Sequence, residues 1–293
     1  MHLAQVIARQ GKTFIVEDAQ GKQHHCHART SAIEAVCGDN VECACEPNSE
    51  HVIEKILTRK NQITRIDNFK REKTLAANID HMIIVVAATP SFSTLLIDKY
   101  LACAQINKCK ATLVFNKAEL IHAHNIDIGT LENTYKDIAD HFIVCSAKLG
   151  YGIQSLRIVI ANENTILVGQ SGVGKSSLIN RLLHNNQIKV GELSENIQQG
   201  KHTTTNAFAH KINDQGKIID SPGVRTFMPI FQDIQQVMLG YKEFLEHLDN
   251  CKFTDCKHVN EPHCAIKAEV KKNNIKQSRY QSYLEIINEI ENQ

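Results

Sequence analysis

Residues 169–177 read Gly169-Gln170-Ser171-Gly172-Val173-Gly174-Lys175-Ser176-Ser177, and the run to Ser176 fits the phosphate-loop pattern G-x-x-x-x-G-K-[ST]. An apolar run before it predicts a strand over Thr165 to Val168, and an amphipathic pattern after it predicts a helix from Gly174. Glycines let backbone N–H groups wrap a β-phosphate at the positive end of that helix. Lys175 then supplies a charge to the β- and γ-phosphates, and Ser176 supplies a hydroxyl ligand for Mg²⁺. A chance glycine-rich turn would lack both flanking elements, so the stretch predicts a nucleotide site.

Alternating strand and helix patterns surround this loop. Residues His81 to Ala88 form a continuous apolar run, rich in Ile and Val, that is typical of a buried parallel strand. Further strands are predicted over Ala111 to Phe115 and His141 to Cys145, with a helix near Ile153 to Ile160. This alternation predicts an α/β fold with a doubly wound parallel sheet.

Two short motifs upstream of the loop indicate which base the nucleotide carries. Asn116-Lys117-Ala118-Glu119 follows a predicted strand and resembles the N-K-x-D motif of GTPases, whose carboxylate accepts hydrogen bonds from guanine N1–H and the exocyclic amino group. Glu119 replaces the usual Asp and is one methylene longer, which puts guanine selectivity in question. Ser146-Ala147-Lys148 resembles the S-A-K loop, whose backbone N–H meets guanine O6. An Asn-Lys turn alone would carry little weight, but the two motifs together favour guanine.

A threonine-rich segment downstream is expected to be the first switch. Gly200-Lys201-His202-Thr203-Thr204-Thr205 offers three threonines, one of which would complete the Mg²⁺ shell and sense the γ-phosphate. We expect Thr204 in that role. The same run could instead open the strand that continues to Ile212.

The second switch is expected where the strand Lys217 to Ile219 leads into Asp220-Ser221-Pro222-Gly223, a match to D-x-x-G. Asp220 would hold Mg²⁺ through water, and the Gly223 N–H would bond the γ-phosphate. The next position often carries a Gln that orients the attacking water, and here it is Val224. We therefore expect His202 to position water, because histidine titrates near neutral pH. An exposed loop histidine with no catalytic role is the alternative, and turnover without an activator is expected near ~10⁻⁴ s⁻¹.

The sequence near the end places four soft metal ligands close together, at Cys251, Cys256, His258 and Cys264. A Cys₃His set is a standard closed shell for structural Zn²⁺, while scattered thiols beside a loop histidine are the alternative. The chain has ten cysteines, which favours metal ligation over disulfides if thiols are kept reduced.

Residues 1–60 read as five short strands with turn signals between them, which suits a small barrel such as an OB-fold. The predicted strands are Leu3 to Arg9, Lys12 to Glu17, Lys22 to Ala28, Val41 to Glu46 and His51 to Leu57. Any small β-barrel with no nucleic-acid role is the alternative, and the polar stretch 58–73 is predicted to be a linker. Strand alternation explains the histidines and cysteines of this region, with a second metal site as the alternative: His24, His25, Cys26, His27, Cys37, Cys43 and Cys45.

Length and charge limit the remaining possibilities. The 293 residues suffice for two or three compact units, and the net charge of +1 excludes a uniformly basic nucleic-acid binder. No apolar run reaches the ~18 residues of a membrane span, and no signal peptide is evident, so we expect a cytoplasmic protein without membrane contact. A basic helix face near the end contacts phosphates or simply faces solvent; it comprises Lys267, Lys271, Lys272, Lys276 and Arg279.

The order of the motifs is guanine motif, S-A-K loop, P-loop, threonine switch and D-x-x-G, a circular permutation of the usual GTPase order. With the N-terminal barrel and the Cys-Cys-His-Cys cluster, the chain resembles the ribosome small-subunit-dependent GTPase A (RsgA) family over essentially its whole length. The resemblance implies an OB-fold RNA-binding domain at 1–65, a circularly permuted P-loop GTPase domain at 66–231 and a helical zinc-binding domain at 232–293.

The resemblance also implies a function. It implies GTP and GDP as ligands with Mg²⁺, one structural Zn²⁺, and GTP hydrolysis stimulated by the 30S ribosomal subunit during late maturation, with contacts to 16S rRNA. In the family the histidine matching His202 is proposed to serve hydrolysis, and Lys175, Thr204 and Gly223 complete the expected catalytic set. We expect a monomer. The alternatives are a nucleotide-gated RNA-binding protein in which hydrolysis is incidental, and an NTPase that acts on other RNA or on DNA.

Overall fold

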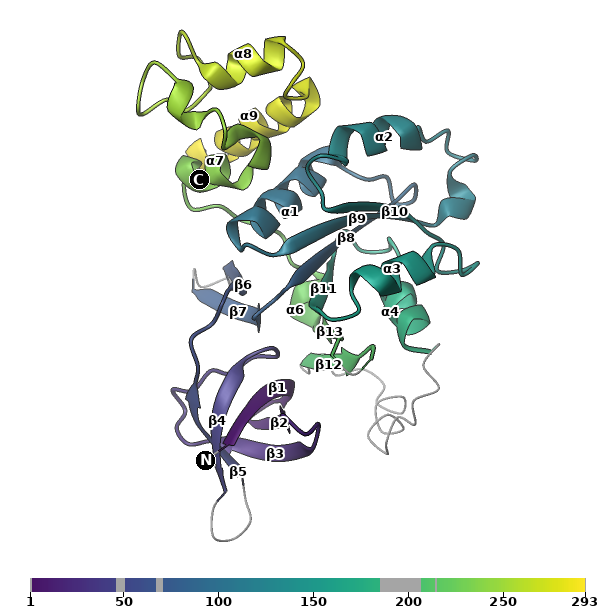
Figure 1. Ribbon diagram of the computed structural model, residues 1–293, viewed down its shortest axis with the longest axis vertical. Coiled ribbons are helices and arrows are strands. Elements are labelled where there is room, and N and C mark those ends of the chain that lie inside the picture. The colour runs from purple at the N-terminus through teal and green to yellow at the C-terminus, as the bar shows by residue number, and fades with distance from the viewer. Residues whose placement is uncertain (1, 46–50, 67–70, 185–206, 214, 293) are drawn as a thin grey trace.

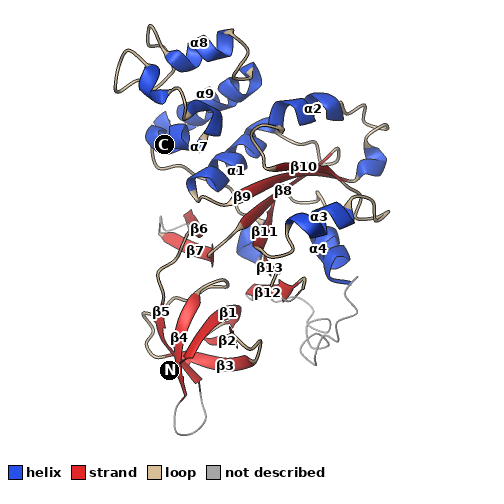
Figure 2. Ribbon diagram, viewed as in Figure 1, coloured by secondary structure: helices blue, strands red, loops and turns tan. Residues whose placement is uncertain are grey.

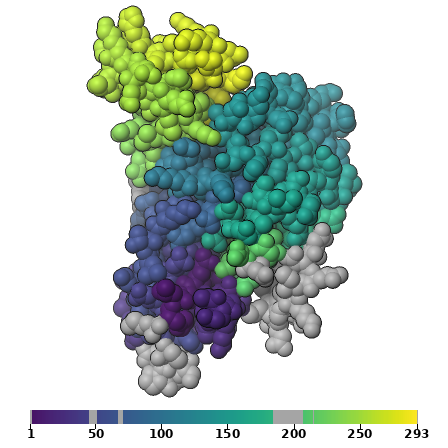
Figure 3. Space-filling model, viewed as in Figure 1, coloured from purple at the N-terminus to yellow at the C-terminus, as the bar shows by residue number. Residues whose placement is uncertain are grey.

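The computed structural model describes residues 2–45, 51–66, 71–184, 207–213 and 215–292. A β-barrel, a layered α/β domain and a helical C-terminal part follow one another along the chain, and Figure 1 shows them in that order in space. The space-filling view places the α/β domain between the other two (Figure 3). The expected first switch at 200–205, with His202 and Thr204, lies outside the described residues.

The N-terminal part is a closed five-stranded barrel of OB type, as predicted. Its strands pair in the order β1-β2-β3-β5-β4, and β4 closes the barrel by pairing with β1. Alternate side chains point inward and form the barrel core, which includes Val6, Val16, Cys26, Val41 and Ile53. The bounds are β1 (His2–Gln10), β2 (Thr13–Asp18), β3 (Gln23–Ala28), β4 (Asn40–Cys45) and β5 (His51–Ile56).

The polar stretch after the barrel is not a linker throughout, and that prediction was wrong. β6 (Gln62–Ile66) and β7 (Glu72–Ala77) pair as an antiparallel hairpin that spans residue 65, the expected end of the first domain. β6 buries Ile63 alone among its residues, and β7 buries the consecutive residues Leu75, Ala76 and Ala77, so neither strand shows the alternation by which a strand is recognised in a sequence.

The barrel contacts this hairpin through a glycine loop. Gly38 has φ of +95°, and a Cβ built on it would lie 2.0 Å from the carbonyl oxygen of Ala77, so only glycine fits there. Asn78 Nδ2 donates to the Gly38 carbonyl at 2.9 Å, and the Ala77 N–H donates to Cys37 at 3.1 Å. These bonds fix the barrel against the start of the α/β domain.

The α/β domain has the predicted parallel sheet, in the order β10-β9-β8-β11-β13, with β12 antiparallel at its edge. β12 also pairs with β1 of the barrel, so a single 11-stranded sheet runs through both parts. The bounds are β8 (His81–Ala87), β9 (Lys110–Asn116), β10 (His141–Val144), β11 (Asn164–Val168), β12 (Ala207–Lys211) and β13 (Lys217–Asp220).

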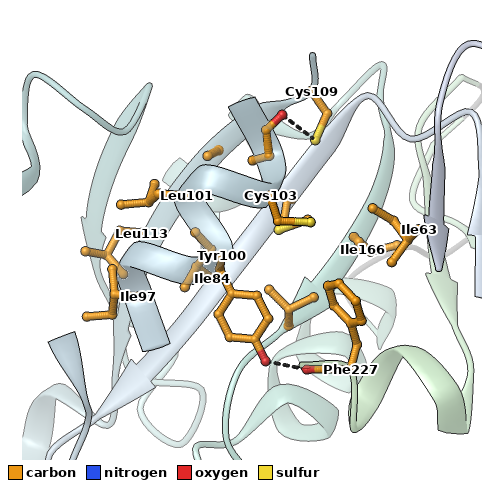
Figure 4. Close-up of a cluster of buried hydrophobic side chains, with 14 of the residues drawn as sticks. Ile63, Ile84, Ile97, Tyr100, Leu101, Cys103, Cys109, Leu113, Ile166 and Phe227 are labelled. Atoms are coloured by element: carbon orange, nitrogen blue, oxygen red, sulfur yellow. Dashed lines mark hydrogen bonds between the residues drawn. The ribbon is translucent and has the colours of Figure 1, made fainter. Parts of the chain in front are cut away.

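Helices cover both faces of this sheet (Figure 2). Alternate residues of β8 enter two separate cores: Ile84 packs with α1 and α2, whereas Ile83 packs with α3 and α4. In the first core, the Tyr100 hydroxyl donates to the Phe227 carbonyl at 2.6 Å (Figure 4). Because both faces are covered, β8 is apolar without alternation. The bounds are α1 (Thr94–Ile106), α2 (Ile128–Tyr135), α3 (Ile153–Val159), α4 (Lys175–His184) and, after β13, α6 (Pro222–Arg225).

The C-terminal part is helical, as predicted, and it packs on α1. A Cβ on Gly240 would lie 2.7 Å from the Ala102 side chain, so glycine permits the close approach of the two helices. Arg279 is buried against this interface, which removes it from the expected basic surface face. Within the described ranges, no helix combines the length and apolar character needed to cross a bilayer. The bounds are α7 (Ile234–Gly240), α8 (Ala265–Lys271) and α9 (Gln277–Glu291), with short 3₁₀ turns η1 (Ala118–Leu120), η2 (Lys242–Phe244) and η3 (Leu248–Asn250).

Candidate functional site

The predicted nucleotide motifs that lie within the described residues follow the carboxyl ends of parallel strands. The P-loop follows β11, Asn116 ends β9, Ser146 lies just beyond β10, and Asp220 ends β13. Parallel strands bring these ends to one edge of the sheet, which is where open α/β folds bind ligands. The fold therefore brings together motifs separated by more than a hundred residues in the chain.

The P-loop backbone adopts conformations that require glycine. Gly169 and Gly174 have φ of +134° and +99°. A Cβ on Gly169 would lie 2.2 Å from the Val85 carbonyl oxygen, and one on Gly174 would lie 2.4 Å from Asn116 Nδ2. The loop is thus packed against β8 and β9 with its shape fixed, as backbone wrapping of a phosphate requires.

Lys175 lies at the centre of this loop. Its Nζ donates to the carbonyls of Gly169 and Gln170 at 2.6 and 2.8 Å. Burial lowers the pKa of Lys175, the charge of Arg225 lowers it further, and Asp220 opposes both. Phosphate oxygens of a bound nucleotide can replace the two carbonyls as acceptors of this partly desolvated ammonium, with charge-assisted hydrogen bonds.

Asn116 links the phosphate loop to the base loop. Its side chain is 1% exposed, and Nδ2 donates to the Val173 carbonyl at 2.9 Å. Its Oδ1 accepts from the Ala147 N–H at 3.1 Å. One buried amide therefore sets the distance between the segments expected to hold the two ends of the nucleotide.

Glu119 is exposed at the rim of the same site, where a base can reach it. A hydrogen bond with Ser146 is the main cause that lowers the pKa of Glu119, and the charges of Lys148 and Lys117 add to it. The carboxylate is therefore ionised at neutral pH and accepts hydrogen bonds only, as guanine N1–H requires. Lys117 itself adopts a left-handed backbone conformation, and its Nζ donates to the Thr89 carbonyl at 2.7 Å.

The second switch begins with Asp220 and continues as the short helix α6. Ser221 begins the helix as its N-cap, and its Oγ accepts from the Val224 N–H at 3.1 Å. Val224 is 1% exposed and packs in the core shared with α1, so its side chain cannot orient a water molecule. This burial agrees with the expectation from the sequence that another group orients the attacking water.

Sequence reasoning missed two groups beside Asp220. Arg225 donates to the Asp220 carboxylate from Nε at 2.7 Å and also from Nη2, and this bond raises the pKa of the guanidinium. His210 lies on β12, where burial lowers its pKa and the charge of Asp220 opposes that effect. The position of His210 near Asp220 follows from the strand register, because β12 pairs Phe208 with Asp220. No pattern in the sequence shows that these two strands pair.

The C-terminal cysteines and histidine converge as predicted. Nδ1 of His258 lies 3.5 Å from Cys251 Sγ, 3.4 Å from Cys256 Sγ and 3.3 Å from Cys264 Sγ. All four ligand atoms lie within 4.8 Å of one another. Tetrahedral Zn²⁺ with usual bond lengths places nitrogen and sulfur about 3.6 Å apart, so these residues fit a single zinc ion. The Tyr280 hydroxyl, which donates to the His258 carbonyl at 2.7 Å, holds the ligand loop against α9.

Cys264→Ser is expected to release zinc from this cluster and to unfold the C-terminal part. Metal binding supplies roughly 10–16 kcal/mol in small zinc peptides, and the core around Cys256 and Tyr283 depends on the ligand loop. Metal analysis of the purified chain and hydrogen exchange of α8 and α9 would measure both effects. Cys109→Ala, in the α/β core, is the matched control and should keep its zinc. Full zinc retention in Cys264→Ser would contradict the assignment.

The fold and the site define a class of protein, a P-loop GTPase whose guanine motifs precede its phosphate loop, that is, a circularly permuted GTPase. The model of the RsgA GTPase family matches residues 56–229. The chain belongs to the RsgA GTPase family, as the sequence resemblance implied, and it is a GTP hydrolase.

Known relatives are similar to this chain over nearly its whole length. The small ribosomal subunit biogenesis GTPase RsgA of Haemophilus influenzae strain PittGG is 38% identical over 289 residues, which cover 96% of this chain and 83% of that protein. The crystal structure of YjeQ from Thermotoga maritima is 30% identical with a TM-score of 0.80, over 100% of this chain and 99% of that one. YloQ, described as a circularly permuted GTPase, is 23% identical with a TM-score of 0.76 over 100% and 96% of the chains, and supports the fold alone.

Proposed function

We propose that this GTPase binds the 30S ribosomal subunit, acts late in its maturation, and hydrolyses GTP to GDP and phosphate faster when the subunit is bound. The relative from Haemophilus influenzae is named a small ribosomal subunit biogenesis GTPase. Within this chain, the observation that carries the proposal is the pairing of barrel strand β1 with β12, the neighbour of the switch strand β13. A barrel that contacts rRNA would act directly on the hydrolysis site.

Side chains strengthen this connection between barrel and switch strands. Glu17 of β2 is buried, and its carboxylate pairs with Lys211 at 2.6 Å and with Lys217 at 3.0 Å. Lys217 also donates to the Gln5 side chain at 2.6 Å. Because Lys217 begins the strand that ends at Asp220, a displacement of the barrel would be transmitted along β13 to the second switch.

Each predicted site residue has a role in this reaction. Lys175 and the Gly223 N–H bind phosphate oxygens, Ser176 and Asp220 hold Mg²⁺, Thr204 completes its shell, and His202 positions water. Mg²⁺, when bound, neutralises charge that develops on the phosphates. Arg225 must release the Asp220 carboxylate before Asp220 can serve the metal. The base and phosphate contacts are assigned to Asn116, Lys117, Ala118, Glu119, Ser146, Ala147, Lys148 and residues 169–177.

We propose three working units in the chain, 1–65, 66–231 and 232–293. Separate apolar clusters in the barrel, in the α/β domain and around α9 support three units, but Ile63 of β6 packs in the α/β core, so the β6–β7 hairpin belongs with the second unit. We propose that the barrel and the C-terminal unit contact 16S rRNA, that the protein is a monomer in the cytoplasm, and that zinc serves only structure.

The test is the GTPase rate with and without purified 30S subunits, for wild type and His202→Ala. We expect stimulation by 30S subunits and a loss of roughly 10²–10⁴-fold in the variant, the usual contribution of a positioned proton-transfer group. His122→Ala, an exposed histidine beyond η1, is the matched control and should be stimulated like wild type.

Other outcomes favour the alternatives. Tight 30S binding with no stimulation would support a nucleotide-gated RNA-binding protein in which hydrolysis is incidental. Equal stimulation by 50S subunits, bulk RNA or DNA would support an NTPase that acts on other nucleic acids. Unchanged stimulation in His202→Ala, with the family function intact, would assign the water to another group.

A further inference from the structure

Three histidines from three different strands meet at one end of the N-terminal barrel. They are His2 on β1, His24 on β3 and His51 on β5. The ring centroid of His2 lies 5.3 Å from that of His24 and 5.5 Å from that of His51, and the centroids of His24 and His51 are 4.4 Å apart. Only His24 belongs to the group of barrel residues that the sequence had singled out.

Register explains why these rings share the barrel interior. His2 pairs with Cys43, and His51 pairs with Cys26, which lies two residues beyond His24 on the same face of its strand. Cys26 and Cys43 are both fully buried in the barrel core. The three rings therefore lie over that core, while His25, on the opposite face of β3, is exposed.

The polar atoms of this cluster point to a missing partner. Nε2 of His2 and Nδ1 of His51 are buried and have no hydrogen-bond partner within the described ranges. Nε2 of His24 lies 2.8 Å from Asp18 Oδ2. Buried polar atoms without partners are rare in native proteins, so two in contacting rings call for a common ligand.

We propose that His2, His24 and His51 bind a divalent transition-metal ion at this end of the barrel, with Asp18 orienting His24. A metal–nitrogen bond of about 2.0–2.1 Å places the ion roughly 3.2 Å from each ring centroid, and tetrahedral angles then separate the centroids by about 5.2 Å. Right angles would give about 4.5 Å, so the observed separations span the values that a shared ion requires.

The site closes by rotation of the rings. Among the described residues, the ligand atoms of Cys251, Cys256, His258 and Cys264 already converge on one point. The ring of His24 is instead tilted against the rings of His2 and His51. The terminal torsion of histidine is soft, so turning the rings costs little once a metal is available.

The chemistry of the cluster selects the ion. Imidazole nitrogen suits Zn²⁺, Ni²⁺, Co²⁺ and Cu²⁺ rather than Mg²⁺ or Ca²⁺. A carboxylate on the outer nitrogen of a ligating histidine, as Asp18 provides for His24, is the usual supporting arrangement.

Cobalt binding to the untagged, full-length, zinc-loaded chain tests the site. We expect one further equivalent of Co²⁺ with d–d absorption and no thiolate charge-transfer bands, which separates it from the cysteine cluster. His51→Asn should lose this equivalent, and Asp18→Asn should weaken it by about 10–100-fold. His25→Asn, an exposed histidine on the same strand as His24, is the matched control and should bind like wild type.

Paramagnetic broadening by Co²⁺ in the wild-type protein provides a readout that needs no variant. We expect the NMR signals of residues near His2, His24 and His51 to broaden first. No further equivalent in wild type, equal loss in His25→Asn and His51→Asn, or broadening confined to the C-terminal part would each overturn the proposal.

Discussion

Lys175→Ala is expected to weaken GTP binding by roughly 10²–10⁴-fold and to abolish measurable hydrolysis. The Nζ of Lys175 is already at the centre of the P-loop, held by the Gly169 and Gln170 carbonyls. A hydrogen bond to a charged group contributes about 1.5–3 kcal/mol, and the ammonium makes two such bonds to the β- and γ-phosphates. Titration with a fluorescent GTP analogue would measure the affinity, since each 1.4 kcal/mol is about tenfold.

The melting temperature of Lys175→Ala distinguishes loss of GTP binding from loss of folding. Burial lowers the pKa of Lys175, which means that the ammonium is partly desolvated without a carboxylate bonded to it. Its removal should therefore leave the melting temperature of the nucleotide-free protein nearly unchanged. Lys136→Ala, an exposed lysine just beyond α2, is the control for a lost surface charge. GTP affinity of Lys175→Ala within about threefold of wild type would contradict the P-loop assignment.

Patterns in neighbouring residues of the sequence predicted those parts of the fold whose geometry these neighbours determine. The P-loop glycines and the continuous apolar run of β8 carry their geometry in neighbouring residues, and both are confirmed by the structure. The β6–β7 hairpin was missed because β6 buries one residue and β7 buries three consecutive ones, so neither strand alternates. Its position is set by bonds to distant residues, such as that between Asn61 and Asn107.

The missed parts of the candidate sites depend on pairings between distant segments. β1 and β12 are about two hundred residues apart, so no local pattern shows that the barrel joins the switch strand. The same holds for Arg225, whose role appears only when α6 turns it back onto Asp220. His2 and His51 likewise meet His24 only because the barrel closes.

Arg279→Met is expected to destabilise the protein by about 3–5 kcal/mol and to free the C-terminal part from α1. Arg279 is 1% exposed, and its Nη1 donates to Asp98 of α1 at 2.6 Å while its Nε donates to Glu243 of η2 at 2.7 Å. Its guanidinium also lies 4.3 Å from the Tyr241 ring centroid. These carboxylates raise the pKa of Arg279, so the group stays charged. Its removal leaves buried carboxylates without compensation, which is the source of the cost.

A second ion pair between the same helices provides the control. Lys99 of α1 pairs with Glu289 of α9, whose side chain is 45% exposed. Surface pairs contribute about 0–1 kcal/mol, so Lys99→Ala should scarcely change the urea unfolding curve. Asp98→Asn combined with Arg279→Met should recover part of the loss, because fewer charges remain buried alone.

Hydrogen exchange then shows where the stability is lost. We expect Arg279→Met to increase exchange in α1, α7 and α9 while the zinc content stays unchanged, because Arg279 bonds to Asp98 and Glu243 rather than to a metal ligand. Equal effects of Arg279→Met and Lys99→Ala would mean that the buried pair contributes no more than the exposed one. The expected difference would instead show that the buried pair holds the zinc-binding part on α1 more strongly than the exposed pair does, and that a change at Asp98 of α1 can reach the C-terminal helices through Arg279.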